Sequence, residues 1–105
     1  MAEFEQLVIE DLIEGTGTEV KKGGALVTAH YRGFLEDGTE FDSSYAKGQP
    51  FQTVLSRKKV IAAWAEGLKG MKVGGKRKLL VPAAMGYGER GFGDTIPPNA
   101  NLIFE

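Results

Sequence analysis

Side chains able to carry out covalent chemistry are scarce in this sequence. His30 is the single histidine, and no cysteine occurs among the 105 residues. A thiolate nucleophile, a thiolate metal site and a histidine-rich zinc site are therefore excluded. Asp42 and Ser43 would complete the residue types of a hydrolase triad with His30. However, His30 alternates onto the polar face of its predicted strand and no nucleophile-elbow motif is present, so we predict a solvent-facing or hydrogen-bonded histidine.

The carboxylates differ in their surroundings. Glu36 and Asp37 flank a predicted turn and are expected to be solvated. Asp42 directly follows Phe41 and precedes two serines. A carboxylate placed in this way either caps local backbone or belongs to a polar site, and the spacing alone leaves both interpretations open.

A glycine motif in the C-terminal third resembles a phosphate-binding loop. Residues 86–91 read Gly-Tyr-Gly-Glu-Arg-Gly, which matches the pattern G-x-G-x-x-G. Such a loop requires a helix N-terminus directly behind it to hold the phosphate. Pro97 and Pro98 forbid a regular helix across that point. We therefore predict a long irregular loop over residues 83–98, which at this length is typical of a functional segment.

The aromatic side chains say more about chemistry. Ten aromatic residues and few acid–base groups favour an apolar pocket over acid–base catalysis. The alternative is that these rings simply form the core of a small domain, and periodicity alone does not decide between the two. The aromatic residues from separate predicted elements are Tyr31, Phe41, Phe51, Trp64, Tyr87 and Phe104.

Length and charge narrow the class of protein. A chain of 105 residues is the size of one domain, and its net charge of −1 disfavours nucleic acid and membrane surfaces as partners. No apolar run approaches the 18 residues of a membrane span, and the acidic first residues do not resemble a signal peptide. A cytoplasmic location is therefore expected. The 15 glycines argue against a helical bundle and favour a turn-rich, mainly β domain.

The elements that must position these residues are short. A helix is predicted over residues 57–66, with Ser56 as N-cap and Gly67 ending it in a left-handed conformation. Its stripe of Val60, Ile61, Trp64 and Leu68 must pack against a sheet. Turns are predicted at residues 21–24 and 74–75, with a type I′ hairpin turn at Asp37-Gly38. Strands are predicted over residues 7–12, 26–35, 39–41, 51–55, 76–81 and 99–105, with a loop or bulge over 42–50. This layout is α+β.

Together these motifs resemble the FKBP-type peptidyl-prolyl cis/trans isomerases, from about residue 7 to the end. The matching segments are Val27–Gly33, Leu35–Ser44, Val60–Gly67, Gly70–Gly74, Gly86–Gly88 and Ile96–Phe104. The resemblance implies one domain over residues 1–105, with an antiparallel five- to six-stranded sheet wrapped around one short helix. It also implies that the last strand is truncated after Glu105.

The resemblance further implies roles for individual residues. Trp64 would form the floor of a proline-binding pocket, and the Ile61 N–H would bond a ligand carbonyl. Asp42 and the Tyr87 hydroxyl would be the polar groups near the reacting bond, with Phe41 beside them as a third catalytic residue. The remaining wall residues would be Tyr31, Phe51, Val60, Ile61, Ile96 and Phe104.

The implied activity is cofactor-free and metal-free acceleration of X–Pro bond rotation during protein folding. The implied partners are proline-containing peptides, unfolded proteins and macrolide ligands, with the protein acting as a monomer. A non-catalytic proline-binding or chaperone module and a macrolide-responsive regulator are the alternatives. Lys59 and Ala63 depart from the family pattern at the pocket helix, and Lys47 stands where it can pair with Asp42.

Overall fold

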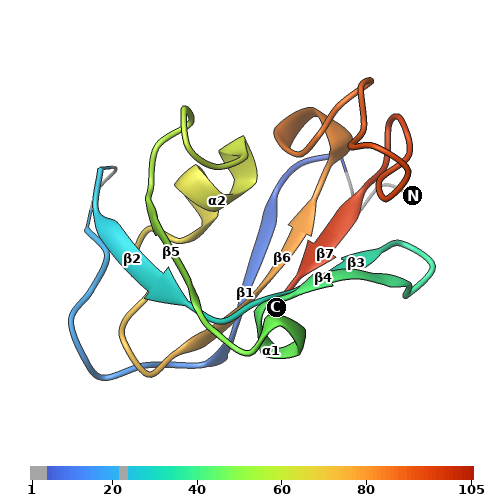
Figure 1. Ribbon diagram of the computed structural model, residues 1–105. Coiled ribbons are helices and arrows are strands. Elements are labelled where there is room, and N and C mark those ends of the chain that lie inside the picture. The colour runs from blue at the N-terminus through green and yellow to red at the C-terminus, as the bar shows by residue number, and fades with distance from the viewer. Residues whose placement is uncertain (1–4, 22–23) are drawn as a thin grey trace.

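The computed structural model describes residues 5–21 and 24–105. A five-stranded antiparallel sheet has the strand order β1-β6-β7-β3-β4, and β2 and β5 form a separate antiparallel ribbon (Figure 1). The elements are β1 (Val8–Ile13), β2 (Leu26–Ala29), β3 (Arg32–Leu35), β4 (Glu40–Ser43), α1 (Ser44–Lys47), β5 (Phe51–Val54), α2 (Ala62–Gly67), β6 (Lys76–Val81), a 3₁₀ turn (Ala83–Met85) and β7 (Leu102–Phe104). The predicted α+β class and the antiparallel sheet with a short helix are confirmed. The predicted turn at residues 21–24 lies partly outside the described residues.

The prediction of a single strand over residues 26–35 is wrong. The segment contains two strands, β2 and β3, which belong to different sheets. The ladder breaks at Tyr31, whose N–H donates to Ser44 Oγ at 2.7 Å and whose carbonyl oxygen accepts from Ser44 N–H at 3.0 Å. Because a side chain takes the place of a strand partner, the chain can leave one sheet and enter the other.

The hairpin between β3 and β4 is present, but its turn is not type I′. Gly38 has φ +92°, whereas Asp37 does not have the positive φ that a type I′ turn requires. The Gly38 N–H donates to the Leu35 carbonyl at 2.9 Å, and the Leu35 N–H donates to the Thr39 carbonyl at 2.8 Å. This is a three-residue loop closed by a left-handed glycine. Beyond it, the strand register shifts between Gly33 and Phe34, where Phe41 forms a bulge in β4.

The helix α2 is shorter than predicted. Residues 57–60 form a turn in which the N–H groups of Lys59 and Val60 both donate to the Ser56 carbonyl. Ile61, not Ser56, is the N-cap, and no side chain caps the helix. Three consecutive cations at the positive end of a helix are unfavourable, which explains why the helix begins after them. Gly67 lies within α2 rather than ending it in a left-handed conformation.

The segment predicted as a loop over residues 42–50 contains the one-turn helix α1. Ser43 is its N-cap and accepts a hydrogen bond from the Ala46 N–H at 3.2 Å. Gly48 ends it with φ +78°. The turn brings Lys47 back toward the end of β4.

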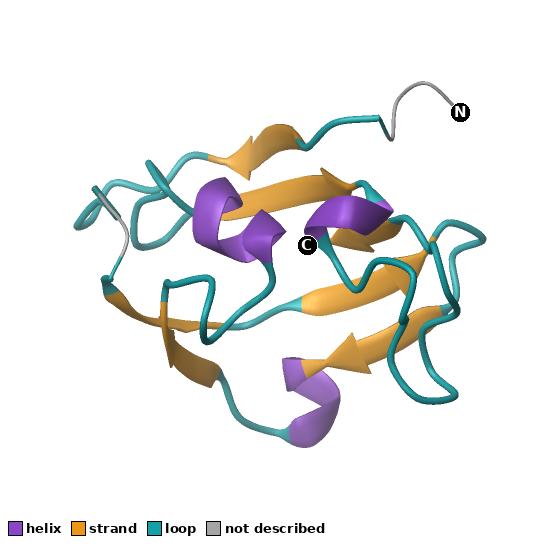
Figure 2. Cartoon of the chain, turned by 90° about the horizontal axis from the view of Figure 1, so that it is seen from above, coloured by secondary structure: helices purple, strands orange, loops and turns teal. Residues whose placement is uncertain are grey.

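The hydrophobic core lies between α2 and the five-stranded sheet. In Figure 2, α2 lies over the strands from one face. Within the described residues, no helix is long and apolar enough to cross a bilayer. The buried cluster consists of Ala63, Trp64, Leu79, Val81, Ile96, Leu102 and Phe104.

Candidate active site

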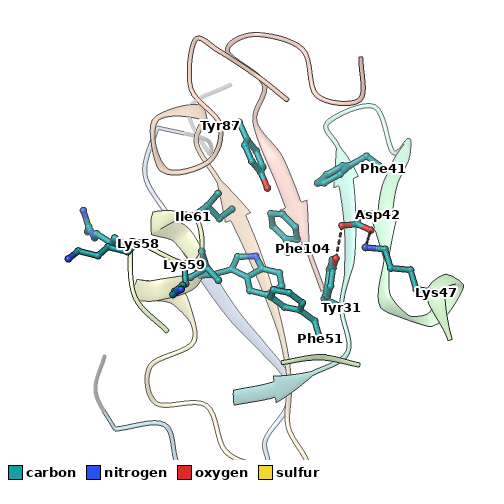
Figure 3. A pocket seen from close by; sticks show the side chains of 13 residues that line it. Tyr31, Phe41, Asp42, Lys47, Phe51, Lys58, Lys59, Ile61, Tyr87 and Phe104 are labelled. Atoms are coloured by element: carbon teal, nitrogen blue, oxygen red, sulfur yellow. Dashed lines mark hydrogen bonds and ion pairs between the residues drawn. The ribbon is translucent and has the colours of Figure 1, made fainter. Parts of the chain in front are cut away.

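A cavity of about 570 Å³ opens between α2, the sheet and the loop over residues 83–98 (Figure 3). Its walls are mainly aromatic, and its rim carries several cations. The lining residues are Tyr31, Phe41, Asp42, Lys47, Phe51, Arg57, Lys58, Lys59, Val60, Ile61, Trp64, Tyr87 and Phe104. They come from both sheets, both helices and the long loop, so the fold brings distant segments to one place.

Trp64 is the centre of the aromatic wall. Tyr31, Phe51 and Phe104 all meet its indole edge to face, with ring centroids 5.0, 5.8 and 5.5 Å away. Phe41 meets Phe104 in the same geometry at 5.6 Å. Edge-to-face contacts fix the orientation of each ring, so the cavity surface is held in shape before a ligand enters. The indole N–H of Trp64 is buried and has no hydrogen-bond partner among the described residues.

Asp42 is the only carboxylate among the described residues that line the cavity, and it is fixed on three sides. Its Oδ2 accepts a hydrogen bond from the Tyr31 hydroxyl at 2.5 Å. Its Oδ1 lies 3.0 Å from Lys47 Nζ and accepts from the Ser43 N–H at 2.9 Å. Asp42 therefore presents a fixed negative charge to the cavity. The pair with Lys47 expected from the sequence is present.

The same contacts set the protonation states. Burial raises the pKa of Asp42, but the hydrogen bonds from Tyr31 and Lys47 outweigh it, and the pKa lies below its usual value of 3.8. For Tyr31, burial and the hydrogen bond to Asp42 raise the pKa above 10.0. The hydrogen bond to Asp42 likewise raises the pKa of Lys47. At neutral pH the site contains an ionised carboxylate, an ammonium and a neutral phenol.

Tyr87 comes from the long loop and points its hydroxyl into the cavity (Figure 3). Burial, and next the charge of Asp42, raise the pKa of Tyr87 above 10.0, so the phenol is neutral and able to donate. Its ring packs on Phe92, with the centroids 5.5 Å apart. Within the described residues the hydroxyl has no hydrogen-bond partner, which leaves it free for a ligand.

The turn before α2 supplies a second free donor. Ile61 has an extended backbone, and its carbonyl accepts from the N–H groups of Trp64 and Ala65 at 3.0 and 3.2 Å. The Ile61 N–H itself donates to no other described residue. Because Val60 and Ile61 both line the cavity, the N–H of Ile61 is available to a ligand at the rim.

All predicted site residues except Ile96 line the cavity. Ile96 is 2% exposed and belongs to the core cluster, where its backbone is held by two hydrogen bonds to Phe92. Sequence reasoning placed Tyr31 only as an apolar wall and missed its hydrogen bond to Asp42. It also missed Arg57 and Lys58 as lining residues, although their position directly before Lys59 could have indicated it.

The hydrolase triad is absent from the described residues. The exposed His30 faces Ser44, with Nδ1 3.0 Å from Oγ, and stacks on Tyr45 with the ring centroids 4.6 Å apart. Asp42 instead bonds Tyr31 and Lys47. His30 is thus hydrogen-bonded and exposed, as predicted.

A model of the family described as FKBP-type peptidyl-prolyl cis-trans isomerase matches residues 17–105. The chain belongs to this family. An FK506-binding protein of Neisseria meningitidis serogroup A is 57% identical over 99 residues, which cover 94% of this chain and 90% of the relative. FK506-binding protein 1 of Debaryomyces hansenii is 46% identical over 97 residues, covering 92% and 87%.

Solved structures agree with this membership. The crystal structure of AtFKBP13 has a TM-score of 0.84 at 38% identity and covers 93% of this chain and 86% of that one. The crystal structure of FkpA from Escherichia coli also has a TM-score of 0.84, at 44% identity, and covers 93% and 44%. The FKBP-type family and these relatives indicate peptidyl-prolyl cis-trans isomerase activity.

Proposed function

We propose that the aromatic cavity binds the proline of protein and peptide segments and accelerates rotation of the preceding bond, so that the protein assists folding. The observation that carries this proposal is the cavity lining. Among the described lining residues, the single carboxylate is already bonded to Tyr31 and Lys47, and the residues other than the cations of the rim are aromatic or aliphatic. Such a surface suits binding and desolvation of a proline ring better than covalent attack on it.

Desolvation favours the reaction for a physical reason. The X–Pro bond resists rotation by about 18–20 kcal/mol because rotation breaks amide resonance. The planar amide is more polar than the twisted one, since the twisted nitrogen no longer donates its lone pair to oxygen. An apolar cavity therefore penalises the planar ground state more than the transition state.

The negative charge of Asp42 acts in the same direction as desolvation. A carbonyl oxygen carries more negative charge in the planar amide than in the twisted one, so the fixed charge of Asp42 beside it repels the ground state more. The Tyr87 hydroxyl and the Ile61 N–H are donors without partners among the described residues, and they hold carbonyls of the bound segment. All these steps use groups of the chain itself and form no covalent bond.

The same cavity is proposed to bind macrolides. The curated relatives carry the name FK506-binding protein, and they cover most of this chain. We expect such a ligand to place an apolar ring over Trp64 and to compete with proline peptides. Trp64 is the only tryptophan, so its fluorescence should change on titration with the macrolide. If calorimetry shows binding but the fluorescence spectrum does not change, Trp64 does not form the floor of the binding site.

A protease-free exchange assay by NMR tests the activity. We expect Asp42→Asn and Tyr87→Phe each to lower kcat/KM for an X–Pro peptide about three- to tenfold, the factor expected for one lost polar interaction. Matched controls are Glu10→Gln and Tyr45→Phe, which change exposed side chains outside the cavity. If the unmodified protein binds the peptide but exchange stays at the uncatalysed rate, the protein is a non-catalytic proline-binding module and not an isomerase.

A further inference from the structure

The rim of the cavity is strongly asymmetric in charge. Among the described residues, four cations line it, against the single carboxylate of Asp42. The four are Lys47, Arg57, Lys58 and Lys59. The whole chain carries a net charge of −1, so this concentration of positive charge is local and does not reflect a basic protein.

Two of these cations are already neutralised. Lys47 Nζ lies 3.0 Å from Asp42 Oδ1, and Arg57 Nη2 lies 3.2 Å from Glu66 Oε2. Lys58 and Lys59 form no ion pair with any described residue. The unbalanced charge of the rim is therefore carried by these two adjacent lysines.

The position of these lysines fits contact with a bound chain. They lie in the turn that leads directly into Val60 and Ile61, which line the cavity and carry the free N–H donor. In Figure 3 they stand on one side of the opening, with Asp42 and Lys47 on the other. Both are exposed, so their ammonium groups can reach a peptide that passes over the rim.

Electrostatics then selects among peptides. Exposed ammonium groups attract a carboxylate within a Debye length, about 8 Å at physiological ionic strength. The low-dielectric aromatic wall beside them strengthens the attraction relative to open water. Asp42 stands on the opposite side of the opening, and its pairing with Lys47 weakens its repulsion of a second carboxylate.

We propose that Lys58 and Lys59 make this cleft selective for X–Pro segments that carry Asp or Glu close to the proline, on the side of the segment that faces α2. This inference rests on the proposed function and specifies its substrate class. A single exposed ion pair changes an equilibrium modestly. Two lysines acting together should favour an acidic segment over its amide counterpart by about three- to tenfold in kcat/KM.

The test uses peptides that keep the reacting bond constant. Peptides Xaa-Leu-Pro-Phe and Leu-Pro-Phe-Xaa, blocked at both ends, are compared with Xaa as Glu, Gln or Lys. Because the residues next to the rotating bond do not change, uncatalysed exchange rates stay comparable. We expect the order Glu, Gln, Lys in one of the two series, which also shows on which side of the proline the lysines act. The preference should shrink as salt rises from 20 mM to 500 mM.

Charge reversal provides the decisive comparison. The double variant Lys58→Glu/Lys59→Glu should invert the order, so that the Lys peptide exceeds the Glu peptide. The control Lys21→Glu/Lys76→Glu makes the same change in net charge at exposed positions outside the cavity and should keep the original order. Equal rates for Glu and Gln peptides in both series, or inversion by the control as well, would overturn the proposal.

Failure of the isomerase activity would be recognised separately. If no peptide is accelerated, the proposed function fails, and the Kd values from Trp64 fluorescence still measure selectivity. Tighter binding of the Glu peptide that is lost in Lys58→Glu/Lys59→Glu would support the acidic preference. Equal Kd values would refute it.

Discussion

The hydroxyl of Tyr31 donates a 2.5 Å hydrogen bond to Oδ2 of Asp42. The hairpin between them creates this contact, because its register places Gly33 opposite Asp42 and Arg32 opposite Ser43. Ser44 holds the backbone of Tyr31 from the other side. The register of the hairpin and the contacts of Ser44 together position the polar group of the cleft.

Removing this hydroxyl should loosen Asp42 without changing the shape of the wall. We expect Tyr31→Phe to raise the pKa of Asp42, because the hydrogen bond from Tyr31 lowers it. The free energy of unfolding should fall by about 1 kcal/mol, as for one partly buried hydrogen bond. Carboxyl ¹³C NMR titration and urea unfolding measure the two effects. An unchanged Asp42 titration would show that the hydrogen bond does not set its pKa.

Stability should depend on pH through the same pair. The folded pKa of Asp42 lies below 3.8, so as pH falls the unfolded chain takes up the proton first and the stabilisation by Asp42 is lost below about pH 4. The folded pKa of Tyr31 lies above 10.0, so its contribution is complete below pH 10 and is lost as pH rises further. Urea unfolding from pH 2 to 11 should show that Asp42→Asn flattens the acid limb. An acid limb identical to that of the unmodified protein would contradict this assignment.

Gly33 is required because two rings pack over it. A Cβ atom at this position would lie 2.7 Å from Phe41 Cζ and 2.9 Å from Phe104 Cε1. We expect Gly33→Ala to destabilise the fold by about 1–3 kcal/mol, the usual cost of overpacking. In the background Phe41→Leu, which removes the nearer atom, the same substitution should cost less. Thermal unfolding of the four proteins in this cycle tests it, and additive costs would contradict it.

Residues appended after Glu105 have a defined place in the register. Phe104 pairs with Gly33 and with Leu79, and Glu105 exchanges two backbone hydrogen bonds with Arg32. The following positions would therefore run along β2 on one side and the first residues of β6 on the other. We expect six alternating apolar and polar residues to join the ribbon to the sheet and raise Tm by several degrees. A Gly/Ser extension of equal length is the control, and equal Tm values would refute the register.

The elements with strong local signals were predictable from the sequence. Strand β6 lies at the predicted residues, and β1 is displaced by only one residue from its prediction. The break between β2 and β3 was not predictable, because it depends on Ser44, which is 13 residues from Tyr31 along the chain. The start of α2 was misplaced for a local reason, since three cations are unfavourable at the positive end of a helix and the Ser56 carbonyl accepts backbone bonds in a separate turn.

The resemblance to the family assigned more residues to the candidate site than hydrophobic periodicity and local motifs did. Periodicity did not decide whether the aromatic residues form the core or line a cavity. The structure shows that Trp64 serves both, as a buried residue of the core cluster that also lines the cavity. The resemblance placed Ile96 in the wall of the pocket, whereas the structure packs it in the core cluster.

The separate β2–β5 ribbon has a consequence for how the walls of the cleft are held. Phe51 stands on this ribbon, whereas Phe41 and Asp42 stand on the five-stranded sheet. In the described part of the chain the two walls are joined by ring contacts and chain connections, and no strand ladder runs between them. The spacing of the two walls therefore depends on the contacts of Phe51 with Tyr31 and Trp64, and not on hydrogen bonding between strands.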